Sequence, residues 1–492
     1  MPGMKLSESE YKDKVFACWL GKNIGGTLGA PYEGRREAHS LTYYDPVPDG
    51  SAPNDDLDFQ LVWLKMLQDR GVNPRLEDFV DYWIRDLSSY PWNEYGFCRR
   101  NLERGLRPPI SGCFENYFVD EMGSPIRSEI WACLAPGDPQ LAAELAWMDS
   151  ALDHAGGEGT CGEMFWSAVE SAAFVVSDPR VLIRVGLSMI PIWSQISRVI
   201  REAVWCSDNG VPWGEARERV LRCFGHQQPC HAPQNHGFTA IGWLYGRDFG
   251  DRLCKAVNCG YDTDCTGATL GSLLGILGGT SGIPREWRDP VGERVVLHKF
   301  TRNLDAPGTV EELTEQTTQL AHKMTSERSD IVRLAGRTSL PGDMISLLMR
   351  NEKAALALAR DPMSAISTVG DCEIALHYWG EPVLLPGVEK TIGVSVSSGL
   401  LPRKCAVSLR APPGWRAVAV GEMGGQHRFK LRSGKVADRN AIAVEVDVGG
   451  QRLSATYAIL GPGEAKGYPC GHNVPTCPKC HARLEACICA TA

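Results

Sequence analysis

The sequence predicts a multidomain protein in which an all-α domain is followed by an antiparallel β-sandwich and a small Cys/His-rich tail. Three observations lead to this fold class. Apolar residues recur at helical spacing up to about residue 330, alternate with polar residues from about residue 365, and give way to closely spaced cysteines and histidines near the end. The chain of 492 residues also exceeds the size at which one core keeps growing. We therefore expect domains at 10–330, 365–463 and 468–490, with 331–364 as a helical linker.

Helical spacing is clearest after an acidic cluster near residue 55. The stretch LDFQLVWLKMLQDRG places four leucines on one face, namely Leu57, Leu61, Leu64 and Leu67. Similar patterns occur in PQLAAELAWMDSALDHA, EMFWSAVESAAFVV and PWGEARERVLRCF. Little of this region alternates with period two, so we expect an all-α domain.

Two stretches carry a glycine every four residues. The first holds Gly21, Gly25 and Gly29, and the second holds Gly267, Gly271 and Gly275. A glycine inside a helix is less stable than alanine by roughly 1 kcal/mol, so three on one face indicate the close approach of another backbone. The second stretch has only about fifteen uncharged residues where a bilayer needs about 20, so we expect two buried helices of a soluble domain and no membrane association.

Short alternating runs, separated by Gly- and Pro-rich turns, predict the β-sandwich. The apolar members of these runs are Ile374, Leu376 and Tyr378; Ile392, Val394 and Val396; Cys405, Val407 and Leu409; Ile442, Val444, Val446 and Val448; and Leu453, Ala455, Tyr457 and Ile459. Five or more strands in about a hundred residues are typical of an immunoglobulin-like module. Without a catalytic-looking cluster, this module is expected to be structural, or a surface for a partner or substrate.

The tail is dense in metal-ligand residues. A Cys-x-x-Cys flanked by further cysteines and histidines predicts a structural Zn²⁺ site. Two ligand sets remain open: Cys470, His472, Cys477 and Cys480, or Cys477, Cys480, Cys487 and Cys489.

Charge and composition limit the partners. The net charge of −8 disfavours nucleic acid and anionic membranes, while a small anionic ligand is still compatible with it. The polar start MPGMKLSESEYKDK does not read as a signal peptide, which favours a cytoplasmic location. Most of the 18 cysteines are scattered singly in apolar segments and are expected to be reduced and buried.

Two acidic clusters lie about two hundred residues apart, each where a helix is expected to start. They are Asn54-Asp55-Asp56 and Asp262-Thr263-Asp264. Each alone would be an ordinary helix cap. Brought together, four carboxylates repel one another, and a hard divalent cation relieves that repulsion. The pair therefore predicts a site for Mg²⁺, with Ca²⁺ or Mn²⁺ as alternatives.

Four segments in order resemble the ADP-ribosylglycohydrolase family, of the dinitrogenase-reductase-activating glycohydrolase type. GKNIGGTLGAPYEG resembles the opening glycine helix of the family, and NDDLDFQLVWL resembles its Thr-Asp-Asp metal motif. GSPIRSE resembles the loop that cradles ribose and phosphate, and CGYDTDCTGATLGSLLG resembles the Asp-x-Asp-Thr motif. The resemblance spans roughly residues 12–290. It implies an all-α fold, a pair of Mg²⁺ ions beside ADP-ribose, and hydrolysis of a bond at the anomeric carbon of ribose.

Site residues follow from this resemblance by position. It implies metal ligands at Asp55, Asp56, Asp262 and Asp264, a flap glutamate at Glu33, substrate contacts from Gly123, Ser124 and Arg127, and a histidine near the ligand at His154. The residues implied to take part in catalysis are Glu33, Asp55 and Asp56. For His154, a helix-end histidine bonded to backbone carbonyls is an equal alternative.

The chain departs from the family pattern at four positions. Asn54 and Cys265 stand where the family has Thr, Gly26 where it often has Asp, and Met122 where it has Asn. Asn54 keeps an oxygen ligand, whereas Cys265 is a poor ligand for a hard metal, and Thr266 is the expected substitute.

The resulting expectation is a metal-dependent hydrolase that cleaves a ribosyl N- or O-glycosidic bond of an ADP-ribosyl or nucleoside-like substrate. A metal-free hydrolase with two carboxylates is the mechanistic rival. The alternative outside enzymology is a non-catalytic ADP-ribose or nucleotide binder that recruits partners through the β-sandwich and the tail.

Overall fold

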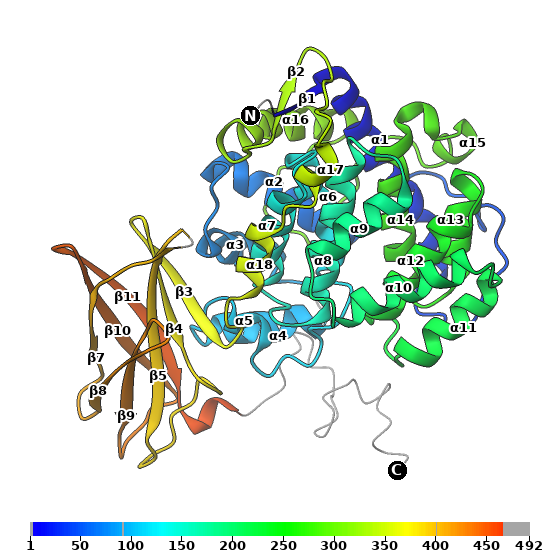
Figure 1. Ribbon diagram of the computed structural model, residues 1–492. Coiled ribbons are helices and arrows are strands. Elements are labelled where there is room, and N and C mark those ends of the chain that lie inside the picture. The colour runs from blue at the N-terminus through cyan, green and yellow to red at the C-terminus, as the bar shows by residue number, and fades with distance from the viewer. Residues whose placement is uncertain (1–2, 91–92, 400, 466–492) are drawn as a thin grey trace, which may run out of the picture. The chain divides into compact units, whose positions relative to one another are not determined.

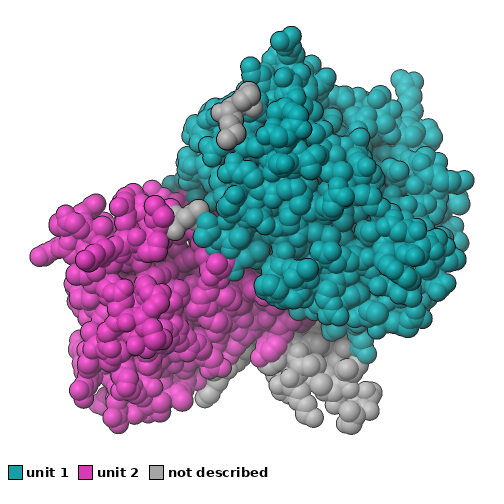
Figure 2. Space-filling model, in the orientation of Figure 1, with its two compact units in different colours: residues 1–74, 120–147, 158–358 teal, residues 75–119, 148–157, 359–492 magenta. Residues whose placement is uncertain are grey.

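The computed structural model describes residues 3–90, 93–399 and 401–465. The Cys/His-rich tail expected at 468–490 lies outside these residues, so its Zn²⁺ site stays a prediction. Within them, the chain forms two compact units, coloured separately in Figure 2. Unit 1 comprises 1–74, 120–147 and 158–358, and unit 2 comprises 75–119, 148–157 and 359–492.

Unit 1 is mainly helical. Its helices are α1 (Glu8–Gly29), α2 (Asp55–Arg70), α6 (Ser128–Leu134), most of α7 (Pro139–Ser150), α8 (Glu158–Ala173), α9 (Pro179–Ser188), α10 (Gln195–Asp208), α11 (Trp213–Phe224), α12 (Ala232–Tyr245), α13 (Phe249–Val257), α14 (Thr263–Gly278), α15 (Arg285–Arg288), α16 (Val310–Glu327), α17 (Met344–Leu348) and α18 (Glu352–Leu358). Short 3₁₀ turns cover Ala30–Tyr32, Pro125–Arg127 and Thr280–Gly282. Among the described residues, none of the helices has the length and apolarity needed to cross a membrane.

One small element of unit 1 differs from the expectation. β1 (Met4–Ser7) pairs in parallel with β2 (Val332–Ala335), so the segment 331–364, expected to be a helical linker, contains a strand as well as α17 and α18. Four-residue strands are too short to show an alternating pattern, and their pairing joins residues more than three hundred positions apart.

The glycines of α1 and α14 face each other, as the sequence predicts. A Cβ built on Gly25 would lie 1.9 Å from the carbonyl oxygen of Gly267, and one built on Gly271 would lie 2.1 Å from that of Gly21. Neither position accepts a side chain at this helix separation. The two helices lie side by side in Figure 1, and their contact fixes the start of α14 against the end of α1, where Thr263 donates its hydroxyl hydrogen to the carbonyl of Gly29 at 2.8 Å.

Unit 2 contains two antiparallel sheets and a short helical part. One sheet has the order β11-β10-β7, and the other has β3-β4-β5-β9-β8 with β6 paired to β5. The strands are β3 (Ser364–Val369), β4 (Cys372–His377), β5 (Lys390–Ser398), β6 (Leu401–Pro402), β7 (Ala406–Arg410), β8 (Arg416–Met423), β9 (Gln426–Arg432), β10 (Arg439–Val448) and β11 (Gln451–Leu460). The helical part has α3 (Leu76–Tyr82), a π-helical turn at Trp83–Leu87, α4 (Asn93–Glu103) and α5 (Ile110–Cys113).

The alternating residues of the two sheets form one apolar core. Ile374 opposes Val396 in one sheet, and Val444 opposes Ala455 in the other, and all four are buried in the same cluster. Residues of the helical part such as Ile110, in α5, complete this cluster, which is why 75–119 belongs to unit 2 although the sequence placed it in the first domain. A helical region followed by antiparallel strands is thus confirmed, while the immunoglobulin-like type remains a prediction.

Candidate active site

The two acidic clusters stand at the starts of α2 and α14, both in unit 1. Asn54 is the N-cap of α2, and its Oδ1 accepts a hydrogen bond from the Asp56 amide at 2.9 Å. Asp262 is the N-cap of α14, but its carboxylate caps no amide of the helix. The interpretation as an ordinary cap therefore holds for Asn54 and fails for Asp262.

Buried acidic groups from both helix starts meet. One ligand atom each from Asp56, Asp264 and Cys265 lies within 4.8 Å of the others, and the Cys265 thiol contacts Asp56 Oδ1 at 3.5 Å. Asp56 and Asp262 are almost fully buried, with exposed fractions of 0% and 1%. Within 3–90, 93–399 and 401–465, no hydrogen-bond partner is found for four buried oxygens: Asp56 Oδ2, both oxygens of Asp262, and Asp264 Oδ1. Desolvated carboxylates without donors are unstable when charged, so this arrangement suits either bound protons or a cation.

The electrostatics agree with this conclusion. Burial, and then the charge of Glu33, raises the pKa of Asp262 to about 8, and burial and Asp262 raise the pKa of Asp264 well above its usual range. Burial likewise raises the pKa of Asp56, against the opposing effect of Lys22. The donor set is rich in carboxylate oxygen, so it fits a hard divalent cation. Burial also raises the pKa of the Cys265 thiol, which makes it a weak ligand beside these oxygens.

Glu33 lies at the exposed edge of the cluster. The charge of Asp264, followed by partial desolvation and the charge of Asp55, raises its pKa to about 8. Water screens part of this repulsion, because the Glu33 side chain is exposed. The pKa of Glu33 is nevertheless shifted upward, because three carboxylates, those of Glu33, Asp55 and Asp264, lie close together. Glu33 is therefore a group that can hold or release a proton near neutral pH.

Thr266, expected to replace the family's threonine ligand, is fully buried in the first turn of α14. Its hydroxyl donates to the carbonyl of Thr263 at 3.2 Å, as a helical threonine commonly does. The oxygen keeps a lone pair, so Thr266 stays a candidate ligand. The small residue Gly26 leaves room for Asn54, because a Cβ there would lie 2.8 Å from Asn54 Nδ2.

A buried lysine, which the sequence analysis did not single out, supports the cluster from α1. Lys22 Nζ donates to Glu129 Oε1 at 2.9 Å and to the carbonyl of Ile126 at 3.0 Å, and lies 3.9 Å from Asp56 Oδ2. Gln60 donates to the other oxygen of Glu129 at 2.8 Å and to the Asp56 carbonyl at 2.8 Å. This network ties α1, α2 and α6 together. Lys22 is the one charged residue in the stretch 15–29 of the sequence, and this was the available signal.

The expected substrate loop is held by its own network. Ser124 donates to Glu163 Oε2 at 2.5 Å, and Arg127 Nη2 lies 3.9 Å from the same oxygen. Both side chains are fully buried, and the Arg127 guanidinium lies 5.3 Å from the centre of the Phe59 ring. These two residues therefore shape the loop, in which Gly123 is also buried.

A second segment, around residues 226–236, braces this loop. The Met122 amide donates to the Cys230 carbonyl at 2.8 Å, and the Ala232 amide donates to the Asp120 carbonyl at 2.7 Å. Met122 itself is 1% exposed, so its side chain belongs to the core. This bracing role was not predicted from the sequence.

The Glu33 segment is fastened to the residues just before Asp262. Gly34 donates to the Tyr261 carbonyl at 2.8 Å, and Tyr261 donates back to the Arg35 carbonyl at 2.6 Å. Arg217, 6% exposed, donates to the carbonyls of Cys259 at 2.8 Å and Arg36 at 2.6 Å. Arg217 is a positioning residue that sequence reasoning missed, since it lies about 180 positions from one partner.

His154 belongs to unit 2, within 148–157. It is fully buried, and its Nδ1 lies 2.7 Å from Asp153 Oδ1. A ligand-binding role for His154 stays a prediction.

A helical unit with buried carboxylates at two helix starts defines a candidate active site that could hold a metal ion. The family model described as ADP-ribosylglycohydrolase matches residues 7–326, and the chain belongs to this family of hydrolases. A search among curated proteins finds no match. Among solved structures, the chain is similar to an "ADP-ribosylglycohydrolase-related protein complex" at 21% identity, with a TM-score of 0.41, over 65% of this chain and 99% of that one.

Proposed function

We propose that this hydrolase depends on a divalent metal and cleaves a ribosyl N- or O-glycosidic bond in an ADP-ribosyl or nucleoside-like substrate. Family membership supports the bond type. The observation that carries the metal dependence is the set of buried carboxylate oxygens on Asp56, Asp262 and Asp264 for which the described part of the chain supplies no hydrogen-bond partner.

Mg²⁺ suits this donor set best, and Ca²⁺ and Mn²⁺ also take oxygen ligands. Asp55, Asp56, Asp262 and Asp264 would hold the cation, and Asn54 and Thr266 would add neutral oxygens. When bound, a divalent cation orients sugar hydroxyls and lowers the pKa of a coordinated water.

The chain's own residues contribute in two further ways. Departure of the leaving group builds positive charge on the sugar ring, and a buried acidic cluster stabilises such charge. Glu33, at the exposed edge of the carboxylate cluster, is placed to accept a proton from a water or return one to the leaving group. Lys22 limits the repulsion around Asp56, and Arg217 fixes the segment that carries Glu33.

The substrate loop is proposed to act through its shape. Ser124 and Arg127 are engaged with Glu163, so they hold the loop near Gly123 in place for the substrate. The loop is thereby held in one conformation before the substrate binds, and a small displacement of the loop would lower the rate of hydrolysis.

The test is product analysis with ADP-ribosyl-arginine, ADP-ribosyl-serine and a panel of nucleosides, each with Mg²⁺ and after EDTA. We expect release of a free sugar that needs the cation. The double variant Asp55→Asn/Asp56→Asn should abolish it. Asp69→Asn, at an exposed acid of the same helix paired with Lys65, should leave it unchanged. ADP-ribose binding without turnover of any substrate would favour the non-catalytic binder instead.

A further inference from the structure

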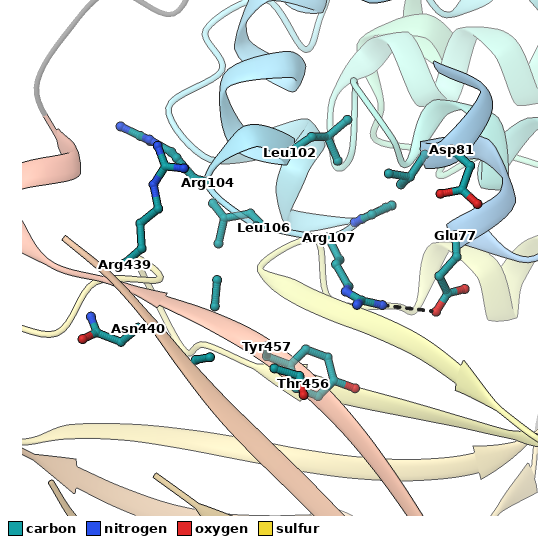
Figure 3. Close-up of a pocket in the computed structure, with 15 residues that line it drawn as sticks. Glu77, Asp81, Leu102, Arg104, Leu106, Arg107, Arg439, Asn440, Thr456 and Tyr457 are labelled. Carbon is teal, nitrogen blue, oxygen red and sulfur yellow. Dashed lines mark ion pairs between the residues drawn. The ribbon is translucent and has the colours of Figure 1, made fainter. Parts of the chain in front are cut away.

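Unit 2 contains a cavity that no role proposed above uses. It has a volume of about 600 Å³ and lies between the helical part and strands β10 and β11, with every lining residue in unit 2 (Figure 3). This volume lies within the range of about 300–1,000 Å³ that is usual for small-molecule sites.

Charges of opposite sign occupy opposite walls of the cavity. Figure 3 shows Arg104 and Arg439 on one side, Glu77 and Asp81 on the other, and Arg107 between them. Arg107 Nη1 and Glu77 Oε1 form an ion pair at 3.8 Å (Figure 3), so part of the acidic charge is balanced within the protein. The arginines of the opposite wall favour an anion there, and the carboxylates favour a hydrogen-bond donor.

The arginines are held in place by the protein. Arg104 is 3% exposed, bonds Glu115 at 3.3 Å, and its guanidinium lies 5.8 Å from the centre of the Phe114 ring. Arg439 donates to the carbonyl of Glu103 at 2.7 Å. Because their orientation is fixed before a ligand arrives, little side-chain entropy is lost when they bind an anion.

The acidic wall has spare acceptor capacity. Glu77 Oε1 accepts the Thr368 amide at 2.8 Å, and the Glu77 side chain is 28% exposed. A carboxylate oxygen accepts more than one hydrogen bond, so a ligand hydroxyl or amino group can donate to the exposed part of this carboxylate. Between the two walls, Leu102, Leu106 and Ala458 give an apolar surface that suits a ring.

We propose that this cavity binds a phosphorylated nucleoside or sugar, with its phosphate at Arg104 and Arg439 and a hydroxyl or amino group at Glu77. The guanidinium fork matches phosphate oxygens in pairs. A neighbouring hollow of about 500 Å³ shares Arg439, Asn440, Ala441 and Thr456 with the cavity, so a longer ligand finds room there. The proposal does not depend on the proposed function.

The test is hydrogen–deuterium exchange of the full chain with AMP, adenosine and inorganic phosphate. AMP should slow exchange in segments 102–107, 439–442 and 456–458. Adenosine alone and phosphate alone should each bind at least about tenfold more weakly than AMP, because each lacks one set of contacts. Protection only at 121–127 and 262–266 would place the ligand at the carboxylate cluster and overturn the proposal, as would no protection at millimolar AMP.

Variants sharpen the result. Arg439→Gln should weaken AMP protection about tenfold or more, whereas Arg416→Gln, an exposed arginine of β8 that does not line the cavity, should not. If Arg439→Gln lowers the melting temperature, Arg439→Lys takes its place, because it keeps the charge and loses the planar fork that matches phosphate oxygens. Protection that is equal in all these variants would overturn the proposal.

Discussion

The contact between α1 and α14 gives the sharpest prediction about stability. In Gly25→Ala, the new Cβ would lie 1.9 Å from the carbonyl oxygen of Gly267, whereas ordinary contact begins at 3.4 Å. Backbone atoms cannot rotate away, so the helices must separate by about 1.5 Å at this point, enough to lose much of the local dispersion energy.

The magnitude follows from two opposing terms. Overpacking at a rigid contact destabilises by about 3 kcal/mol or more, and the better helix propensity of alanine returns about 1 kcal/mol. We expect a net loss of at least about 2 kcal/mol, which lowers the melting temperature of a large domain by roughly 4–8 °C. Since α14 carries Asp264, hydrolytic activity should fall as well.

The assay is calorimetric melting together with activity of the folded protein. The matched control is Gly278→Ala, at the end of α14, where a Cβ meets no heavy atom within 4 Å. It should be neutral or slightly stabilising. If Gly25→Ala melts at or above the temperature of Gly278→Ala with full activity, the close backbone approach is not what stabilises this pair of helices.

Three further predictions concern the groups around the carboxylate cluster. Lys22→Met leaves buried Glu129 without its cation and should destabilise by about 3–5 kcal/mol in urea unfolding, against less than about 1 kcal/mol for the exposed Lys12→Met; equal losses would contradict the buried network. In the metal-free protein, Asp262 has a pKa of about 8 in the folded state and near 4 in the unfolded state. Between these two pH values the folded state holds a proton that the unfolded state has lost. The contribution of Asp262 to the free energy of unfolding therefore falls as the pH rises from about 4 to 8. Mg²⁺ competes with that proton, so the rise in melting temperature on adding Mg²⁺ should be larger at pH 8 than at pH 6, and a pH-independent rise would argue against a cation at this carboxylate. Arg217→Lys loses the fork that joins two carbonyls and should lower kcat/KM about tenfold with little change in melting temperature, whereas unchanged kinetics would show that the Glu33 segment needs no such tie.

Features with a local physical signature could be predicted from the sequence. Glycine at every fourth position of a helix is unfavourable on its own, so this pattern predicted the contact of α1 with α14. Alternation in β10 and β11 fixed which face of each strand is buried, and the register pairs Val446 with Leu453 as that pattern requires.

Features that depend on distant residues could not be predicted. Lys22 meets Glu129 more than a hundred positions away, and Arg217 fastens a carbonyl about 180 positions away, so neither leaves a periodic trace. The helical segment 75–119 joins the sheets of unit 2 through bonds such as the Thr368 amide to Glu77, across 291 positions. Nothing in its own helical pattern distinguishes it from the helices of unit 1.

The central claim is that the carboxylates at the starts of α2 and α14 bind one divalent cation or more. Isothermal titration of the EDTA-treated protein with Mg²⁺ tests it most directly, with Asp262→Asn and the exposed Asp69→Asn compared in parallel. We expect saturable binding that Asp262→Asn weakens by about tenfold or more and Asp69→Asn leaves unchanged. Absence of binding by the wild-type chain, or equal binding by all three proteins, would contradict the account.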